Sequence, residues 1–454
     1  MSWIISLLVL CTVFSVVGSI VGGIAGLVPG LHPNSIAALL AGFPQLFAMF
    51  TVENERGALD PVVASSLFLG CFLIGVLMGH SLTEIIPTAM LGISDDETVI
   101  AQLPSQRLYR LGRSDLVIEA DVIGGIGSVA LFALLFMPTR FIMGEPVGLY
   151  SSIKHFMAFL LLGISVFVLL SSRYQKRLLL SSISFILSGI IGLMVLTMQI
   201  PTQLTVSIFG GAWPGDSSTF LLPAFSGFFA IPALLFSSGD RTMINANFST
   251  GERIRAPIGR PMLRSLVSSV LVGWIPGITN AYATSLTTHR RRADGCSIES
   301  AYQYLVTYTA TNVGGSLQSI IAMATIFRAR NGTLEAINDH FSTGVLGWFQ
   351  EFEPPMTIIA FIWAACIAAV TGTWLCMLFG RALLRGSTGR SFRTVRTVIL
   401  LFILLLVLWT SGPMGLIVLF SCSTLGAWTI FKGAPRVHLM GFLLVPVIVY
   451  FLFN

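Results

Sequence analysis

Apolar stretches long enough to cross a lipid bilayer recur from one end of this chain to the other. A membrane-spanning helix needs about 20 consecutive apolar residues. The 454 residues are 54% hydrophobic and only 10% charged, whereas soluble proteins carry about 25% charged residues. We therefore expect an all-α polytopic membrane protein without a separate soluble domain. The segments expected to be embedded are Ile4–Ile24, Val62–Leu82, Leu116–Phe136, Ile153–Leu170, Leu178–Met198, Phe220–Phe236, Leu263–Ile275, Leu305–Phe327, Ile358–Leu378, Val398–Trp409, Leu416–Ile430 and Leu439–Phe453.

The stretch "GLVPGLHPN" at 26–34 places helix-breaking residues directly after the first apolar segment. Pro29 has no backbone N–H and Gly30 permits unusual φ/ψ angles, so we expect one helix to stop there and another to begin near Pro33–Ser35. Non-helical backbone at membrane depth is tolerated only inside protein or along a polar cavity. The free N–H groups and positive dipole end of the new helix suit an anion such as a carboxylate.

A second stretch, "GWIPGITNA" at 273–281, aligns Pro276-Gly277 with Pro29-Gly30. Two later pairs of segments match in the same order: "MGHSLTEIIPTA" at 78–89 with "VGGSLQSIIAMA" at 313–324, and "SGFFAIPALLF" at 226–236 with "MGFLLVPVIVY" at 440–450. We infer two repeats, residues 1–236 and 263–454, joined by a polar linker at 237–262.

The charges of corresponding loops change sign between the two repeats. The loop 104–115 holds three arginines, and its counterpart 335–353 holds four carboxylates with no Lys or Arg. Cytoplasmic loops carry the excess of Lys and Arg, so equivalent loops are expected on opposite sides of the membrane. The repeats are therefore predicted to have inverted topology, each with a Pro-Gly broken hairpin and about five transmembrane helices. We expect both termini outside and the linker in the cytoplasm of a cell-membrane protein.

The two helix breaks, brought face to face by inverted repeats, are expected to frame one binding site at the bilayer midplane. The alternative is that each Pro-Gly pair only makes a tight connection between packed helices. The candidate substrate-binding residues are Pro29, Gly30, His32, Asn34, Ser35, Pro276, Gly277, Thr279, Asn280 and Thr284.

Ionisable side chains inside the apolar segments suggest a role in ion coupling, because charge at membrane depth is costly. Glu84 follows His80 by four residues, so both lie on one helix face, where they could carry a proton or coordinate a cation. A structural hydrogen bond between helices is the alternative for Glu84, and capping of a helix end is the alternative for Asp121. The candidate ion-coupling residues are His80, Thr83, Glu84, Asp121 and Asn312.

The chain has none of the short motifs typical of ATP hydrolysis, metalloproteases, serine hydrolases or metal clusters. We therefore expect no enzyme activity and no cofactor beyond Na⁺ or H⁺ as a coupling ion. The net charge of +6 is interpreted as the cytoplasmic Lys/Arg bias of a membrane protein, not as a nucleic-acid interface.

The stretches "GGIAGLVPGLHPN" and "GWIPGITNAYATS" resemble the large membrane subunit of tripartite tricarboxylate transporters, the TctA-like permeases. The first motif is closest to the archaeal-type branch, and "SGPMGLIVLF" and "HLMGFLLVP" extend the likeness to the C-terminal region. The resemblance implies a secondary carrier for a di- or tricarboxylate, driven by a sodium or proton gradient through alternating access. It also implies two partners, a small membrane subunit and an extracytoplasmic solute-binding protein.

A different function is also compatible with these residues. Polyprenyl-phosphate translocases also resemble this pattern, and a phosphate head group would use the same helix N-termini while the lipid tail leaves through a lateral opening. A scaffold without transport activity is disfavoured, because paired helix breaks at membrane depth cost stability without an evident structural gain.

Overall fold

The computed structural model describes residues 2–29, 31–41, 47, 50, 53–54, 57–58, 61–92, 98–171, 177–197, 220–236, 256–288, 297–341, 343–349, 352–386 and 392–453. Within these residues the only strands are β1 (Glu53–Asn54) and β2 (Gly57–Ala58), which pair as a small antiparallel hairpin. Gly30 and most of the expected linker, 237–255, lie outside the described residues.

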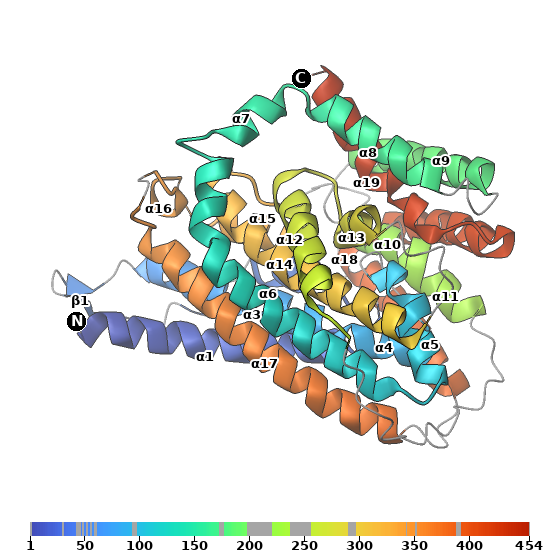
Figure 1. Cartoon of the computed structure of the whole chain (residues 1–454), viewed down its shortest axis with the longest axis horizontal. Coiled ribbons are helices and arrows are strands. Elements are labelled where there is room, and N and C mark those ends of the chain that lie inside the picture. Colours follow the sequence, from blue (N-terminus) through green and yellow to red (C-terminus); the bar gives the residue numbers. More distant parts are fainter. Residues whose placement is uncertain are drawn as a thin grey trace.

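The remaining regular structure is helical, as the composition predicts (Figure 1). In the first half of the chain the α-helices are α1 (Ser2–Ala25), α2 (Pro33–Ala41), α3 (Pro61–Thr83), α4 (Ile85–Leu91), α5 (Gln102–Arg110), α6 (Ser114–Met143), α7 (Leu149–Lys154), α8 (Met157–Ser171), α9 (Leu178–Thr197), α10 (Leu221–Phe225) and α11 (Ile231–Phe236). In the second half they are α12 (Gly259–Trp274), α13 (Asn280–Thr288), α14 (Ile298–Ile326), α15 (Gly332–Asn338), α16 (Thr343–Leu346), α17 (Met356–Gly386), α18 (Phe392–Lys432) and α19 (Gly441–Phe453). Three short helical segments are η2 (Thr98–Ile100), η6 (Ser226–Ala230) and η8 (Arg436–Met440).

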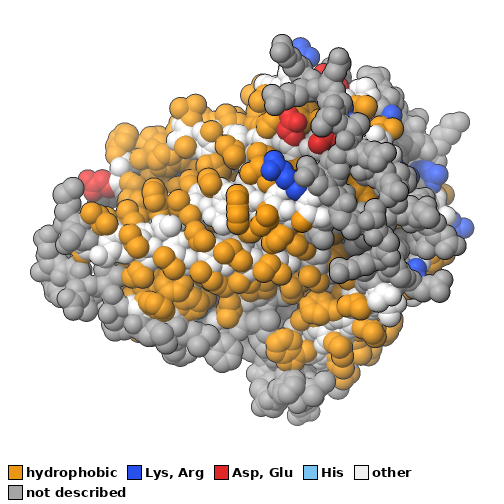
Figure 2. Space-filling model, turned by 90° about the horizontal axis from the view of Figure 1, so that it is seen from below, with side chains coloured by type: hydrophobic (Ala, Val, Ile, Leu, Met, Phe, Trp, Pro, Cys, Tyr) orange, Lys and Arg blue, Asp and Glu red, His pale blue; other side chains and the backbone are white. Residues whose placement is uncertain are grey.

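Seven helices among the described residues are long and apolar enough to cross a membrane, which confirms the prediction of an all-α polytopic membrane protein. They are Trp3–Ala25, Val62–Met90, Ser114–Met143, Leu178–Leu196, Met356–Ala382, Arg396–Lys432 and Arg436–Phe453. Figure 2 shows one face covered mainly by hydrophobic side chains, with few charged ones among the side chains it colours. Such an apolar surface is suited to lipid.

The expected segments Val398–Trp409 and Leu416–Ile430 join into one helix, α18, with a kink between them. Gly412 has φ 62° and ψ −161°, a conformation that favours glycine, and Pro413 follows it. Proline removes a backbone donor and its ring disturbs the preceding turn. The sequence therefore predicts two helical segments, and the structure places the break between them at Gly412.

Helix α14 lies at the centre of the fold although it is rich in polar residues (Figure 1). Every residue from Leu305 to Ala324 is buried. The helix packs against α6 on one side and α12 on another. Because protein rather than lipid surrounds it, its Thr, Asn, Gln and Ser side chains can find polar partners within the fold.

Helices α1, α3 and α17 pack closely together through small residues. A Cβ atom added at Gly22 of α1 would lie 2.0 Å from the carbonyl oxygen of Val76 in α3, so only glycine fits at this contact. The hydroxyl groups of Ser15 and Ser19 donate hydrogen bonds to the carbonyls of Ala364 (2.6 Å) and Ala368 (3.0 Å) in α17. Small residues and hydroxyl hydrogen bonds are the usual means of close helix packing in membranes.

The contact at Gly22 makes a testable prediction about stability. Gly22→Ala should lower the melting temperature of the purified protein, because overpacking costs about 1–3 kcal/mol and outweighs the gain in helix propensity of about 1 kcal/mol. Gly163→Ala in α8 is the matched control, since an added Cβ there meets no atom within 4 Å. A melting temperature that rises equally in both variants would contradict the tight α1–α3 contact.

Candidate functional site

The first Pro-Gly motif separates α1 from α2 as the sequence predicts. Helix α1 ends at Ala25, and α2 begins at Pro33. Between them the chain makes tight turns, with the Leu31 N–H donating to the Val28 carbonyl at 3.1 Å. Pro29 lies in this connection. The break brings His32 to the start of the second helix.

The second motif separates α12 from α13 in a corresponding way. Helix α12 ends at Trp274 and α13 begins at Asn280. Between them Pro276 is followed by Gly277, which has φ 78°, in the left-handed region that glycine adopts without strain. Thr279 stands directly before α13, and its hydroxyl oxygen accepts a long hydrogen bond from the Tyr282 N–H at 3.4 Å.

A buried carboxylate lies between the two motifs. Glu84 stands at the junction of α3 and α4 and is 3% exposed. Its Oε1 accepts hydrogen bonds from the Tyr308 hydroxyl (2.8 Å) and from Nδ2 of Asn312 (2.6 Å), both on α14. Its Oε2 lies 3.3 Å from Nδ1 of His80, one helical turn earlier. One carboxylate therefore ties α3 to α14.

This network reaches both helix breaks. The rings of His80 and His32 lie 5.6 Å apart between centroids, which joins Glu84 to the first motif. On the other side, Oδ1 of Asn312 accepts a hydrogen bond from Nδ2 of Asn280, at 2.7 Å, in the second motif. We call the set His32, His80, Glu84, Tyr308, Asn312 and Asn280 the Glu84 network.

Two oxygen atoms beside the network have unused hydrogen-bonding capacity. Among the described residues, Oδ1 of Asn280 and Oγ1 of Thr284 are buried without a hydrogen-bond partner. Thr284 follows Asn280 by four residues, so the two side chains share one face of α13. Buried polar atoms are normally satisfied, and an unsatisfied pair of oxygens marks a place where an ion, a water molecule or a substrate can bind.

Other candidate residues from the sequence stand outside the network. The Thr83 hydroxyl donates to the Gly23 carbonyl of α1 at 2.9 Å, a contact between helices. Oδ1 of Asn34 accepts two hydrogen bonds from Thr333 of α15, each at 3.0 Å. Ser35 is buried, and its N–H donates to the His32 carbonyl at 3.0 Å. Thr83 and Asn34 therefore link neighbouring helices.

Asp121 lies well inside α6, which begins at Ser114, and so does not cap the helix end. It is 1% exposed, and its Oδ1 accepts a hydrogen bond from the Thr309 hydroxyl at 2.8 Å. The neighbouring Glu119 is exposed and contacts the Tyr302 hydroxyl at 3.3 Å. Two buried carboxylates, on α6 and at the end of α3, therefore bind successive residues of α14.

Tyr308 is the member of the network that sequence reasoning did not identify. The sequence does contain an indication of this role, because Tyr308 precedes Asn312 by four residues and therefore shares its helix face. An aromatic residue in an apolar segment is usually a packing residue, however, and its hydroxyl group gains a role only because α3 places Glu84 opposite.

Comparison with known proteins identifies a family. The model of the tripartite tricarboxylate transporter TctA family matches residues 12–441. An uncharacterized protein of the archaeon Methanocaldococcus jannaschii is 29% identical over 168 residues, which cover 36% of this chain and 37% of the relative's own length. No solved structure matches. Because the family model spans both helix breaks and the whole Glu84 network, the chain belongs to the tripartite tricarboxylate transporter TctA family.

Proposed function

We propose that this chain is the membrane permease of a tripartite carrier, which moves a di- or tricarboxylate by secondary transport coupled to a sodium or proton gradient. The family supports a role in transport. The observation that carries the proposal is a carboxylate, Glu84, buried at membrane depth and hydrogen-bonded to groups that reach both helix breaks. A buried ionisable group in a membrane protein is a functional site by default.

The packing of the long helices supports our proposal that the chain consists of two structurally related repeats. Suppose that α1, α3 and α6 of the first repeat correspond, in this order, to α12, α14 and α17 of the second. The contact of α3 with α17 then corresponds to the contact of α14 with α6. Likewise α1 packs against α3 as α12 packs against α14. Such reciprocal exchange of partners is what a pseudo-two-fold axis produces. With inverted repeats, both termini would lie outside the cell.

In the proposed mechanism the substrate carboxylate binds at the N-termini of α2 and α13. Free backbone N–H groups and the positive ends of the helix dipoles attract an anion there. The hydroxyl group of Thr279 stands at the start of α13 and can contribute a further donor. The two breaks are linked through Glu84, so a substrate between them contacts both repeats at once.

The coupling ion would act at Glu84. The Glu84 carboxylate offers oxygen ligands for a cation, and Oδ1 of Asn280 and Oγ1 of Thr284 on α13 are further buried oxygens without a hydrogen-bond partner. His80, at 3.3 Å, offers a partner for a proton instead. A proton bound to the carboxylate, or a sodium ion beside it, neutralises its charge. Neutralisation weakens its charge-assisted hydrogen bonds to α14, and so alters the contact between the two repeats.

The partners are proposed from the tripartite organisation that the family name states. A small membrane subunit and an extracytoplasmic solute-binding protein would complete the system. The binding protein would deliver the substrate to the outer end of the site, and the permease would provide the passage through the lipid bilayer.

The central test is substitution of the buried carboxylate. In liposomes containing the permease and its partners, Glu84→Gln should reduce uptake of labelled carboxylate driven by an imposed sodium or proton gradient by about tenfold or more, because a neutral amide cannot exchange the ion. Binding of the substrate should persist. Glu119→Gln, which changes an exposed carboxylate, is the control. Gradient dependence that survives in Glu84→Gln would remove the coupling role.

The hydrogen bond from Tyr308 gives a finer prediction. Tyr308→Phe keeps the ring but removes a hydroxyl donor to a charged group, an interaction of about 1.5–3 kcal/mol. The concentration of the coupling ion that gives half-maximal uptake should therefore change by about tenfold or more. Tyr302→Phe on the same helix, whose hydroxyl contacts Glu119, should leave it unchanged. Equal behaviour of the two variants would show that Tyr308 serves packing alone.

A further inference from the structure

A second buried carboxyl group, that of Asp121 in α6, has no role in the mechanism proposed above. The side chain is 1% exposed, and its Oδ1 accepts a hydrogen bond from the Thr309 hydroxyl at 2.8 Å. Its Oδ2 is buried without a hydrogen-bond partner among the described residues. Because buried polar atoms are normally paired, the chemical state of this oxygen needs a physical explanation.

Apolar contacts close the space on both sides of Asp121, on the face that α6 presents to α3 and α17. Ile118 and Gly125 share this face, one helical turn before and after Asp121. A Cβ atom added at Gly380 of α17 would lie 2.6 Å from Cδ1 of Ile118, and one added at Gly125 would lie 2.7 Å from Cδ2 of Leu82 in α3. Such close packing leaves little room for water beside the carboxyl group.

The polar neighbours of Asp121 are weaker hydrogen-bond donors than those of Glu84. The thiol of Cys376, a buried residue of α17, lies within hydrogen-bonding distance of the Asp121 carboxyl group. A thiol is a weak donor. Glu84 is instead surrounded by a hydroxyl, an amide and an imidazole group. A carboxylate that lacks strong donors and water is costly to bury, whereas a neutral acid has no charge to be solvated.

No charged group compensates for the burial of Asp121. Among the described residues, Asp121 forms no salt bridge with the ionisable side chains of α6 or of the helices packed against it. Those with contacts described here are Glu84 with His80 and Tyr308, Glu119 with Tyr302, and Asp115 with Arg113. The others are Tyr109, Arg107 and Arg110 of α5, Arg140 of α6, Tyr150 and Lys154 of α7, Arg260 and Arg264 of α12, Glu299 and Tyr304 of α14, and Arg381 of α17.

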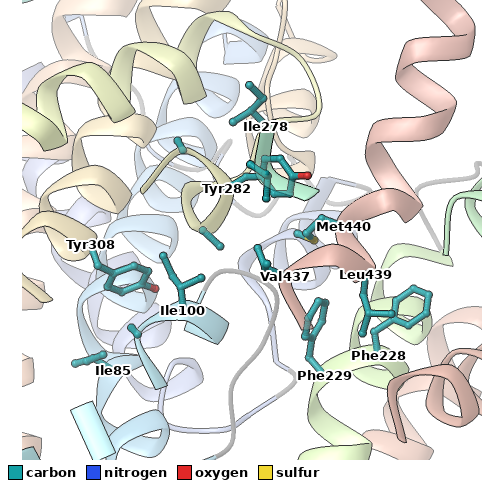
Figure 3. Packing of buried hydrophobic residues seen from close by; sticks show 14 of the residues in the cluster. Ile85, Ile100, Phe228, Phe229, Ile278, Tyr282, Tyr308, Val437, Leu439 and Met440 are labelled. Atoms are coloured by element: carbon teal, nitrogen blue, oxygen red, sulfur yellow. The ribbon is translucent and has the colours of Figure 1, made fainter. Parts of the chain in front are cut away.

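Asp121 lies between helices that also meet at Glu84. Asp121 and Thr309 belong to α6 and α14, whereas Cys376 belongs to α17, which packs against α3. Thr309 directly follows Tyr308, the residue that binds Glu84. Tyr308 and Cys376 belong to one cluster of buried residues, part of which Figure 3 shows around Tyr308. A movement of α3 and α17 away from α6 and α14 would open the surroundings of both carboxyl groups at once.

We propose that Asp121 is a second proton-binding site of the permease, separate from Glu84. In the packed arrangement its carboxyl group is a neutral acid with the proton on Oδ2. When α17 moves away and water reaches Oδ2, the O–H bond breaks and a water molecule takes the proton. The inference rests on the proposed function, and it adds a proton to the transport cycle whichever ion binds at Glu84.

Infrared spectroscopy of the full chain in phosphatidylcholine nanodiscs tests the protonation directly, because a carboxylic acid has a carbonyl stretching band that a carboxylate lacks. At about pH 7, where an ordinary aspartate is ionised, the wild type should show this band, and Asp121→Asn should lose its Asp121 component. Asp115→Asn is the control, since it changes a side chain of the same helix that is 38% exposed. A band that is equal in the wild type and in Asp121→Asn would overturn the inference.

Substitution of Cys376 tests whether the lack of a strong donor is the cause. Cys376→Ser places a stronger donor beside the carboxyl group and should weaken the band, because hydrogen bonds to the charged form favour that form. Cys376→Ala should leave the band unchanged. Cys422→Ser in α18 is the control for serine at a buried cysteine position. A band as strong in Cys376→Ser as in Cys376→Ala would contradict the inference.

Transport measurements separate this inference from the proposed function. In liposomes containing the permease and its partners, the number of protons taken up with each labelled citrate should fall by about one in Asp121→Asn, because an amide cannot bind the proton. Glu119→Gln should leave this number unchanged. The same number in Asp121→Asn and the wild type would overturn the role of Asp121 in transport. If the wild type shows no uptake while its infrared band depends on Asp121, the proton-binding site stands and the transport proposal fails.

Discussion

A carboxylate placed where water is scarce must be solvated by the protein itself, and the arrangement around Glu84 follows from this requirement. The hydroxyl of Tyr308, the amide of Asn312 and the imidazole of His80 supply the hydrogen-bonding groups that water would otherwise provide. These groups come from α3 and α14. Burial of one acidic side chain therefore requires the two helices to remain together.

The helix breaks and the polar central helix have the same physical explanation. Backbone groups freed by Pro29 and Gly277 cannot face lipid, and the described residues of both motifs are buried or half-buried. The same burial allows α14 to carry threonine, asparagine and glutamine through the hydrophobic part of the molecule. This chain of the TctA family thus concentrates its polar side chains inside a shell of apolar helices.

Local chemistry allowed much of the fold to be predicted from the sequence. The start of α2 at Pro33, the break before Asn280 and the pairing of His80 with Glu84 depend on residues close together in the chain. Contacts across the fold could not be predicted in this way. Glu84 meets Tyr308 across 224 positions, and Asn280 meets Asn312 only because α13 packs against α14. Such contacts depend on how whole helices pack, which no local pattern specifies.

The glycine contact between α1 and α3 has a mechanical consequence. Helices α1, α3 and α17 form one triplet, which close backbone contacts and the hydrogen bonds of the Ser15 and Ser19 hydroxyls hold together. Helices α6, α12 and α14 pack together as a second triplet. Each triplet takes two helices from one half of the chain and one from the other. In the proposed mechanism the bodies that move against each other would then be these mixed triplets and not the two halves of the sequence, and Glu84 lies at the contact between them.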